Sequence, residues 1–110
     1  MKILKNIETL APLKIASLIT NSEHTIASKA ICNTEHTDVR FFSYAKDESI
    51  SKEIQEEDSI IYVFEGSLKL QYGKDGESVV NEGELIVIPS GLEYGLYVLE
   101  DSKSLNILVK

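Results

Sequence analysis

The stretch SIIYVFEGSLKLQYGKDGESVVNEGELIVIPSGLEYG, residues 59–95, carries the strongest fold signal in the chain. Short runs of β-branched and aromatic residues alternate in it with turn residues, which is typical of an all-β sandwich or barrel. Its centre, Gly73-Lys74-Asp75-Gly76, predicts a tight hairpin because Asp-Gly readily adopts the positive φ angles of such turns. All six glycines of the chain lie in this stretch. It therefore predicts a β region divided by short turns.

Strand signals continue on both sides of this stretch. We expect eight strands, at residues 25–32, 39–45, 59–65, 67–72, 78–81, 84–88, 94–99 and 104–109. Six acidic residues crowd between the second and third of them, which predicts a solvated rim or loop made of Asp47, Glu48, Glu53, Glu56, Glu57 and Asp58. Upstream, Ile3, Ile7 and Leu10 have helical spacing that Pro12 should interrupt. Residues 1–24 are thus expected to form a short helix or an irregular lead-in.

Length and composition limit the possible classes of protein. The 110 residues suffice for one domain, 1–110, and 43% hydrophobic with 26% charged residues is ordinary for a folded globular protein. The longest apolar run, residues 60–64, is far shorter than the ~20 residues of a membrane helix. A net charge of −7 repels nucleic-acid phosphates. We therefore expect the protein to bind neither membranes nor nucleic acid. Because the single Cys32 cannot form an internal disulfide, we also expect the protein to be cytoplasmic.

Two of the expected strands are apolar on both faces. In residues 60–64 and 85–88 every side chain is hydrophobic, whereas a strand with one face in water alternates apolar and polar residues. One face can turn to a barrel interior, and the other needs a cover. We expect this cover to be the N-terminal segment or a second copy of the chain, and we predict a homodimer because so small a chain has little spare mass.

Two motifs carry a resemblance to a known family. Tyr62-Val63-Phe64-Glu65-Gly66, followed by Gly83-x5-Pro89-x-Gly91, resembles the two motifs of the cupin superfamily. The resemblance covers residues 39–109, and the short spacing between the motifs is similar to that of the small single-domain members. It implies a double-stranded β-helix, a jelly-roll barrel, preceded by the lead-in at residues 1–24.

The resemblance also assigns positions to the metal ligands of the family. Counted from Gly66 and from the Pro89-Ser90-Gly91 turn, the positions of three histidines and one glutamate hold Glu53, Gln55, Tyr94 and Ser59 in this chain. Only Glu53 is a strong ligand for a transition metal, so we expect no metal and no cofactor. The two motifs place these positions around one point, so we expect Glu53, Gln55, Ser59 and Tyr94 to cluster in the barrel and contact a small-molecule ligand. Tyr94 then either plugs the barrel or hydrogen-bonds the ligand.

Four other residues invite functional interpretation. His24 and His36 lie in near-repeats, NSEHT and NTEHT, but a strand over residues 25–32 would hold them roughly 25 Å or more apart, too far to share an ion within one chain. Cys32 is expected to be a buried small hydrophobe. Arg40 either lies on the strand surface or points inward, where its guanidinium would anchor an anionic ligand.

Three classes of function are compatible with these residues. The leading one is a metal-independent cupin-type module that binds a small molecule in its barrel. The second is a metal-free enzyme of the isomerase or epimerase type, in which Glu53 and Tyr94 transfer protons. The third is a non-catalytic scaffold that only dimerises or docks on a protein, its barrel filled by its own side chains. An empty, partly polar cavity would favour the first two, and a filled barrel the third.

Overall fold

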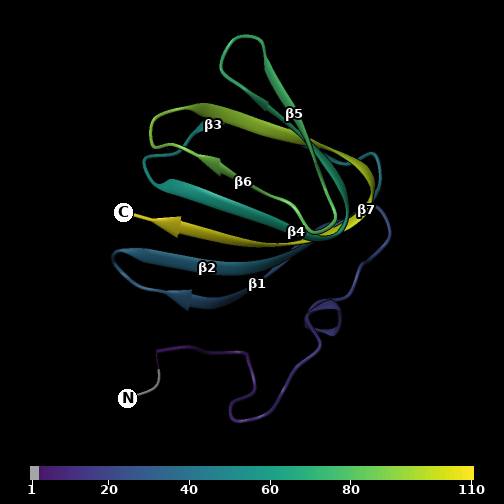
Figure 1. Cartoon of the computed structure of the whole chain (residues 1–110), viewed down its shortest axis with the longest axis vertical. Helices are drawn as coiled ribbons and strands as arrows, with labels where there is room; N and C mark the ends of the chain where they lie inside the picture. Colours follow the sequence, from purple (N-terminus) through teal and green to yellow (C-terminus); the bar gives the residue numbers. More distant parts are fainter. Residues whose placement is uncertain (1–2) are drawn as a thin grey trace.

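The computed structural model describes residues 3–110 and consists mainly of β-strands (Figure 1). In this part of the chain a single 3-10 turn, η1 (Ile15–Ser17), precedes seven strands: β1 (Ile26–Asn33), β2 (Thr37–Tyr44), β3 (Ser49–Ile54), β4 (Asp58–Tyr72), β5 (Gly76–Asn81), β6 (Leu85–Ile88) and β7 (Glu93–Val109). Every strand pairing is antiparallel. The prediction of an all-β fold with an N-terminal lead-in is confirmed.

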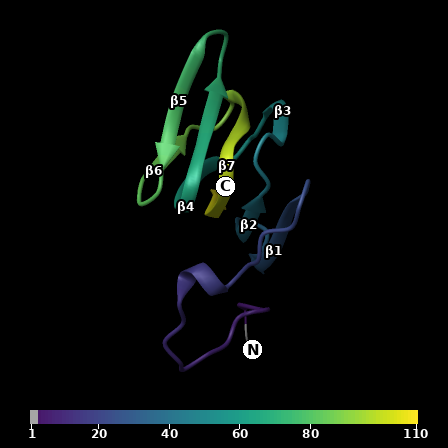
Figure 2. The ribbon, with the colours of Figure 1, turned by 90° about the vertical axis from the view of Figure 1, so that its right-hand side faces the viewer.

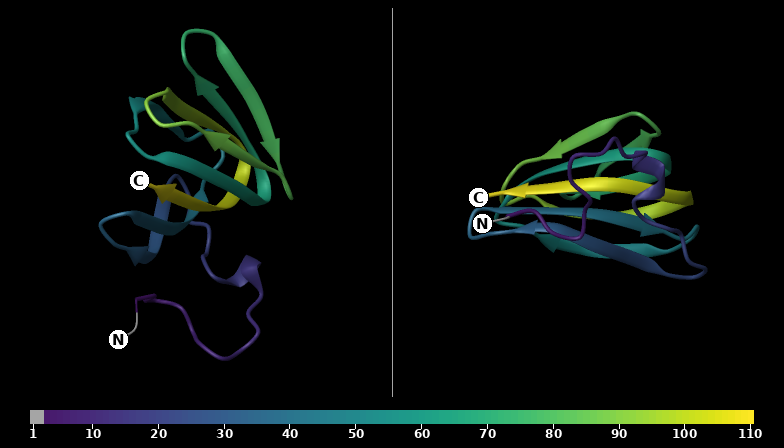
Figure 3. Two further views of the ribbon diagram at one scale, coloured as in Figure 1. Left: turned by 60° about the vertical axis from the view of Figure 1, so that its left-hand side comes forward. Right: turned by 90° about the horizontal axis from the view of Figure 1, so that it is seen from below.

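Strands β4 and β7 run side by side through the middle of the molecule and join its two layers (Figure 1). Residues 58–65 of β4 pair with the C-terminal half of β7, and residues 67–72 pair with its N-terminal half. The first pairing is extended into the layer β1-β2-β7-β4-β6, and the second into the layer β3-β7-β4-β5. Figure 3 shows the two layers of this jelly-roll arrangement from two further directions.

Gly66 lies where β4 passes from one layer to the other. Its φ of +80° is in the left-handed region, and a Cβ there would collide with Ser102 Oγ and the carbonyl oxygen of Asp101 on β7. Around this point the pairing of β4 with β7 is irregular, with register shifts between Val63 and Leu68. Gly66 therefore forms a corner within β4, and the strand continues through it.

Three strand predictions differ from the structure. Residues 59–65 and 67–72 are predicted as two strands and form the single strand β4, and residues 94–99 and 104–109 likewise form β7. The bends do not end these strands because each continues to pair with the other. The acidic stretch is predicted as a rim or loop, whereas Ser49–Ile54 forms β3. This edge strand pairs only with β7 and all its residues are exposed, so its composition carries no strand signal.

Two apolar clusters stabilise the fold. The larger lies between the two layers and consists of Tyr44, Ile61, Val63, Leu68, Leu70, Val80, Leu96 and Val98. The smaller lies on the outer face of the β1-β2-β7-β4-β6 layer, where N-terminal side chains pack on buried residues of the strands; it includes Ile31, Phe41 and Phe64 together with Ile7, Leu18 and Ile19. The N-terminal segment thus covers part of that outer face.

Two lysines fasten the N-terminal segment, which lies beside β1 and far from β3 and β5 (Figure 2). Lys103 Nζ donates to the Ala16 carbonyl at 2.7 Å, and Lys29 Nζ donates to the Leu18 carbonyl at 3.2 Å. Positive φ angles at Asn6 and Leu10 interrupt the helical spacing noted in the sequence, so only η1 forms. Within residues 3–110, no helix has the length and hydrophobicity to cross a membrane.

Candidate functional site

A cavity of about 210 Å³ lies between the two layers. One wall comes from alternate residues of β2 and from the C-terminal half of β7, which place Phe42 and Leu108 inward. The opposite wall comes from β3 and the N-terminal half of β7, which contribute Ile50 and Leu96. The lining is mostly apolar, and a few polar side chains interrupt it: Asp38, Arg40, Ser51, Glu53, Gln55, Tyr94 and Asn106.

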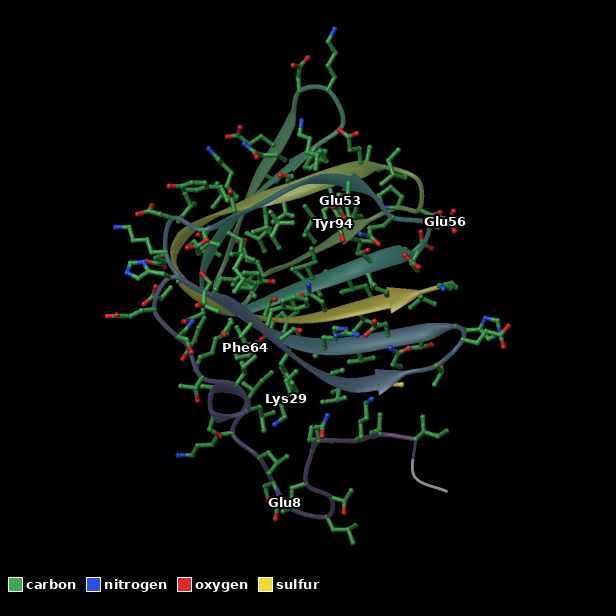
Figure 4. All side chains as sticks on the ribbon, turned by 180° about the vertical axis from the view of Figure 1, so that it is seen from behind. Glu8, Lys29, Glu53, Glu56, Phe64 and Tyr94 are labelled. Atoms are coloured by element: carbon green, nitrogen blue, oxygen red, sulfur yellow. The ribbon has the colours of Figure 1, made fainter. Side chains whose placement is uncertain are left out.

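Three of the four predicted site residues line this cavity, and the fourth contacts one of them. Glu53 and Tyr94 are cross-strand partners on β3 and β7 and lie next to each other (Figure 4), and Gln55 follows β3 in the same wall. Ser59 on β4 is fully buried and accepts a 3.3 Å hydrogen bond from the Tyr94 hydroxyl. Tyr94 and Gln55 are half-buried, whereas Glu53 is exposed at the edge of the cavity.

Arg40 points into the cavity and not onto the outer surface. Its side chain is one-third exposed, and Nε donates to both carboxylate oxygens of Asp38, at 2.9 and 3.1 Å. Strand alternation puts Arg40 on the face of Phe42 and Tyr44. This parity was visible in the sequence, but it does not identify the inner face, because Val39 and Phe41 make the opposite face equally apolar.

A buried hydrogen-bond chain leads to Asn106, which the sequence did not single out. The Tyr44 hydroxyl lies 2.7 Å from Ser104 Oγ, which donates to Asn106 Oδ1 at 2.7 Å. Burial raises the pKa of Tyr44 to about 12, in spite of smaller lowering contributions from Ser104 and Asn106. Tyr44 therefore stays a neutral hydrogen-bond donor at physiological pH. No sequence motif marks Ser104 or Asn106, because their significance comes from the strands beside them.

The remaining candidate residues lie away from the cavity. His24 precedes β1 and His36 follows it, so the two histidines lie at opposite ends of that strand. The His36 side chain is largely exposed, and its Nε2 lies 4.0 Å from a carboxylate oxygen of Glu35. Cys32 is buried in β1.

Comparison with known proteins by sequence finds no matching family model and no matching curated protein. Comparison by structure finds strong matches. A conserved protein of unknown function from Streptococcus pyogenes superposes with a TM-score of 0.95 at 23% identity, covering 100% of this chain and 96% of that one. A cupin superfamily protein from Desulfitobacterium hafniense gives a TM-score of 0.90 at 24% identity, with 96% of each chain covered. This chain has the cupin fold.

A second cupin match differs in length. A cupin 2 conserved barrel domain protein from Leptotrichia buccalis gives a TM-score of 0.90 at 26% identity, covering 99% of this chain but 51% of that one. The resemblance stated from the two sequence motifs is thus confirmed at the level of the fold.

The cupin fold raises the question of a metal in the barrel, and the donor set here does not fit one. At the four ligand positions, Tyr94 and Ser59 bond to each other and Gln55 offers a neutral amide, which leaves Glu53 as the one strong ligand. Among residues 3–110, no three His, Cys, Asp or Glu side chains come together in a way that could hold an ion. The residues at these four positions therefore do not fit a metal ion.

Proposed function

We propose that this protein is a metal-independent, cupin-type module that binds a small organic molecule inside its barrel. The observation that carries the proposal is the cavity of about 210 Å³, lined by apolar side chains with a few polar groups converging from both walls. At the ~30 Å³ that each water occupies in the liquid, this space equals roughly seven waters. The part of the ligand that the barrel encloses is therefore small.

Two alternatives have less support. A scaffold with a filled barrel would leave no such cavity between the layers. An isomerase or epimerase mechanism needs Glu53 and Tyr94 to exchange protons with a substrate that is shielded from water. Glu53 is exposed, and the Tyr94 hydroxyl donates to Ser59. Binding therefore requires fewer assumptions than catalysis.

The direct test places a bulky side chain in the cavity. Leu108→Trp should fill the cavity, whereas Val79→Trp adds the same side chain at an exposed position of β5, outside both the cavity and the outer face of the other layer. With hexan-1-ol as the probe, we expect NMR shift changes at cavity residues of the wild type and of Val79→Trp, and at least a tenfold weaker response in Leu108→Trp. Equal responses in the two variants, or no response in the wild type, would overturn the proposal.

We also propose that the protein is a homodimer. Two rows of apolar residues cross four strands on the outer face of the β1-β2-β7-β4-β6 layer and together form what we call the outer apolar face: Val39, Ile107, Ile60 and Val87 in one row, and Phe41, Leu105, Tyr62 and Leu85 in the other. The N-terminal segment reaches only part of this face, and Leu85 and Val87 remain 58% and 57% exposed. A second copy would cover them, since a stable interface buries a contiguous apolar patch.

The proposal includes a location in the cytoplasm. A single buried cysteine needs no oxidising compartment, and the fold is stabilised by its apolar clusters without a disulfide.

A further inference from the structure

We propose that the ligand is a small organic carboxylate, held through its carboxylate group by Arg40 and Asn106. This inference rests on the proposed binding function and names the chemical class of the molecule. It depends on two hydrogen-bond donors that the fold brings together on one wall of the cavity.

The hydrogen-bond chain behind Asn106 determines which end of its amide faces the cavity. Ser104 Oγ has one proton, and it donates that proton to Asn106 Oδ1. The Tyr44 hydroxyl must then be the donor toward Ser104. Because Oδ1 is engaged in the wall, Asn106 turns its NH₂ group to the cavity.

The Asn106 NH₂ group has donor capacity to spare. An amide nitrogen carries two N–H donors. One of them can go to the Tyr44 oxygen, because hydrogen bonding from Asn106 lowers the pKa of Tyr44. A phenol that donates to Ser104 and accepts one amide proton leaves the second N–H of Asn106 free. Asn106 therefore presents a donor to the accessible space of the cavity.

Arg40 supplies the second donor group. Asp38 accepts only from Nε, which is one of the five N–H donors of the guanidinium. In the described part of the chain, neither terminal nitrogen of Arg40 forms a hydrogen bond. Asp38 thus orients the guanidinium and leaves its outer edge free. That edge is the part of arginine that binds carboxylates through two parallel hydrogen bonds.

Register places the two donors side by side. Arg40 on β2 and Asn106 on β7 are direct cross-strand partners, and both line the cavity. Such partners hold their Cβ atoms ~4.5–5.5 Å apart on one face of a sheet. A carboxylate between them can accept from both, while its apolar chain contacts Phe42 and Leu96. Glu53 lies on the other wall and repels a carboxylate, whereas the charge of Asp38 on the Arg40 wall is balanced by the guanidinium, so the head group is directed to the Arg40 side.

The test compares two probes of equal length, sodium hexanoate and hexanamide, by NMR titration of the full chain. We expect hexanoate to shift the backbone amides around Arg40 and Asn106 and to bind about tenfold or more tightly than hexanamide, as is usual for charge-assisted hydrogen bonds. Asn106→Asp replaces the donor with an anionic acceptor and should weaken hexanoate at least tenfold without weakening hexanamide. Asn33→Asp, an exposed position on β1, is the matched control and should change neither.

Arg40→Lys provides a second variant if Asn106→Asp does not fold. It keeps the positive charge but loses the planar fork, so hexanoate should bind several-fold more weakly and hexanamide unchanged. Equal binding of both probes in the cavity would overturn the carboxylate assignment and leave the proposed function intact. Absence of hexanoate binding, or shifts confined to surface lysines, would overturn the assignment too, while hexan-1-ol binding reports on the proposed function separately.

Discussion

The Tyr94 hydroxyl on β7 donates to Ser59 Oγ on β4, over 3.3 Å, and joins the two sequence motifs inside the barrel. The two residues are 35 positions apart in the chain. Ser59 is fully buried, and Tyr94 is its side-chain partner. The hydrogen bond thus satisfies a hydroxyl that water does not reach, and its loss has a cost that an exposed bond would not have.

Replacing Tyr94 with phenylalanine should destabilise the protein by about 1–3 kcal/mol, because Ser59 Oγ is left buried without a partner. The double variant Tyr94→Phe/Ser59→Ala should recover most of the loss, since both polar groups are then removed together. Urea unfolding of the wild type, the two single variants and the double variant measures this. Strictly additive effects would show that the two hydroxyls are not coupled.

Tyr44 should make the protein lose stability at high pH. Its pKa is raised from 10.0 to about 12 in the folded state, so the folded state binds this proton more tightly than the unfolded state. The contribution of this proton to the free energy of unfolding is fully present below pH 10. It is lost as the pH rises toward 12, which lowers the free energy of unfolding by about 2 kcal/mol. Tyr44→Phe should lack this component. Urea unfolding at pH 9 and pH 11.5 compares the wild type with Tyr44→Phe, and Tyr62→Phe is the control. Equal losses of stability in all three proteins would contradict the assignment of the effect to Tyr44.

Gly66→Ala should destabilise the protein by at least about 3 kcal/mol. The new methyl group combines left-handed backbone strain with a collision against Ser102 and Asp101. Gly83→Ala is the matched control, because Gly83 has a φ of +85° but an added methyl group there would have nothing within 4 Å. It should cost about 1–2 kcal/mol, the strain alone. Thermal unfolding gives both values, and equal losses would show that the close approach of β7 is unimportant.

Charged residues on the outer apolar face should dissociate the homodimer. Light scattering of the wild type at micromolar concentration should give twice the 12.3 kDa chain mass. Leu85→Lys/Val87→Lys should give a single chain mass, because two ammonium groups would be buried without partners. Ile54→Lys, at an exposed position in β3 of the other layer, is the control and should remain dimeric. A wild-type mass near 12 kDa would refute the dimer.

The main features of the barrel could be predicted from local sequence. The glycines and the Pro89 turn mark where the chain changes direction, and strand alternation then determines which residues share a face. The resemblance of the two motifs to the cupin pattern implied one site for Glu53, Gln55, Ser59 and Tyr94, and in the structure three of them line one cavity with Ser59 behind Tyr94. The corners at the glycines and the alternation along each strand depend on backbone geometry that a few residues set locally, so the sequence by itself determined them.

Tertiary structure decided the rest of the site. Alternation shows that Arg40, Phe42 and Tyr44 share a face, but β2 is apolar on both faces, and only packing against the second layer turned that face inward. The acidic stretch became β3 because β7 offered it a free edge. Asn106 became a donor because Ser104 and Tyr44 occupy its oxygen. In each case the deciding partner lies on another strand, and hydrogen bonds and burial between distant residues leave no local pattern in the sequence.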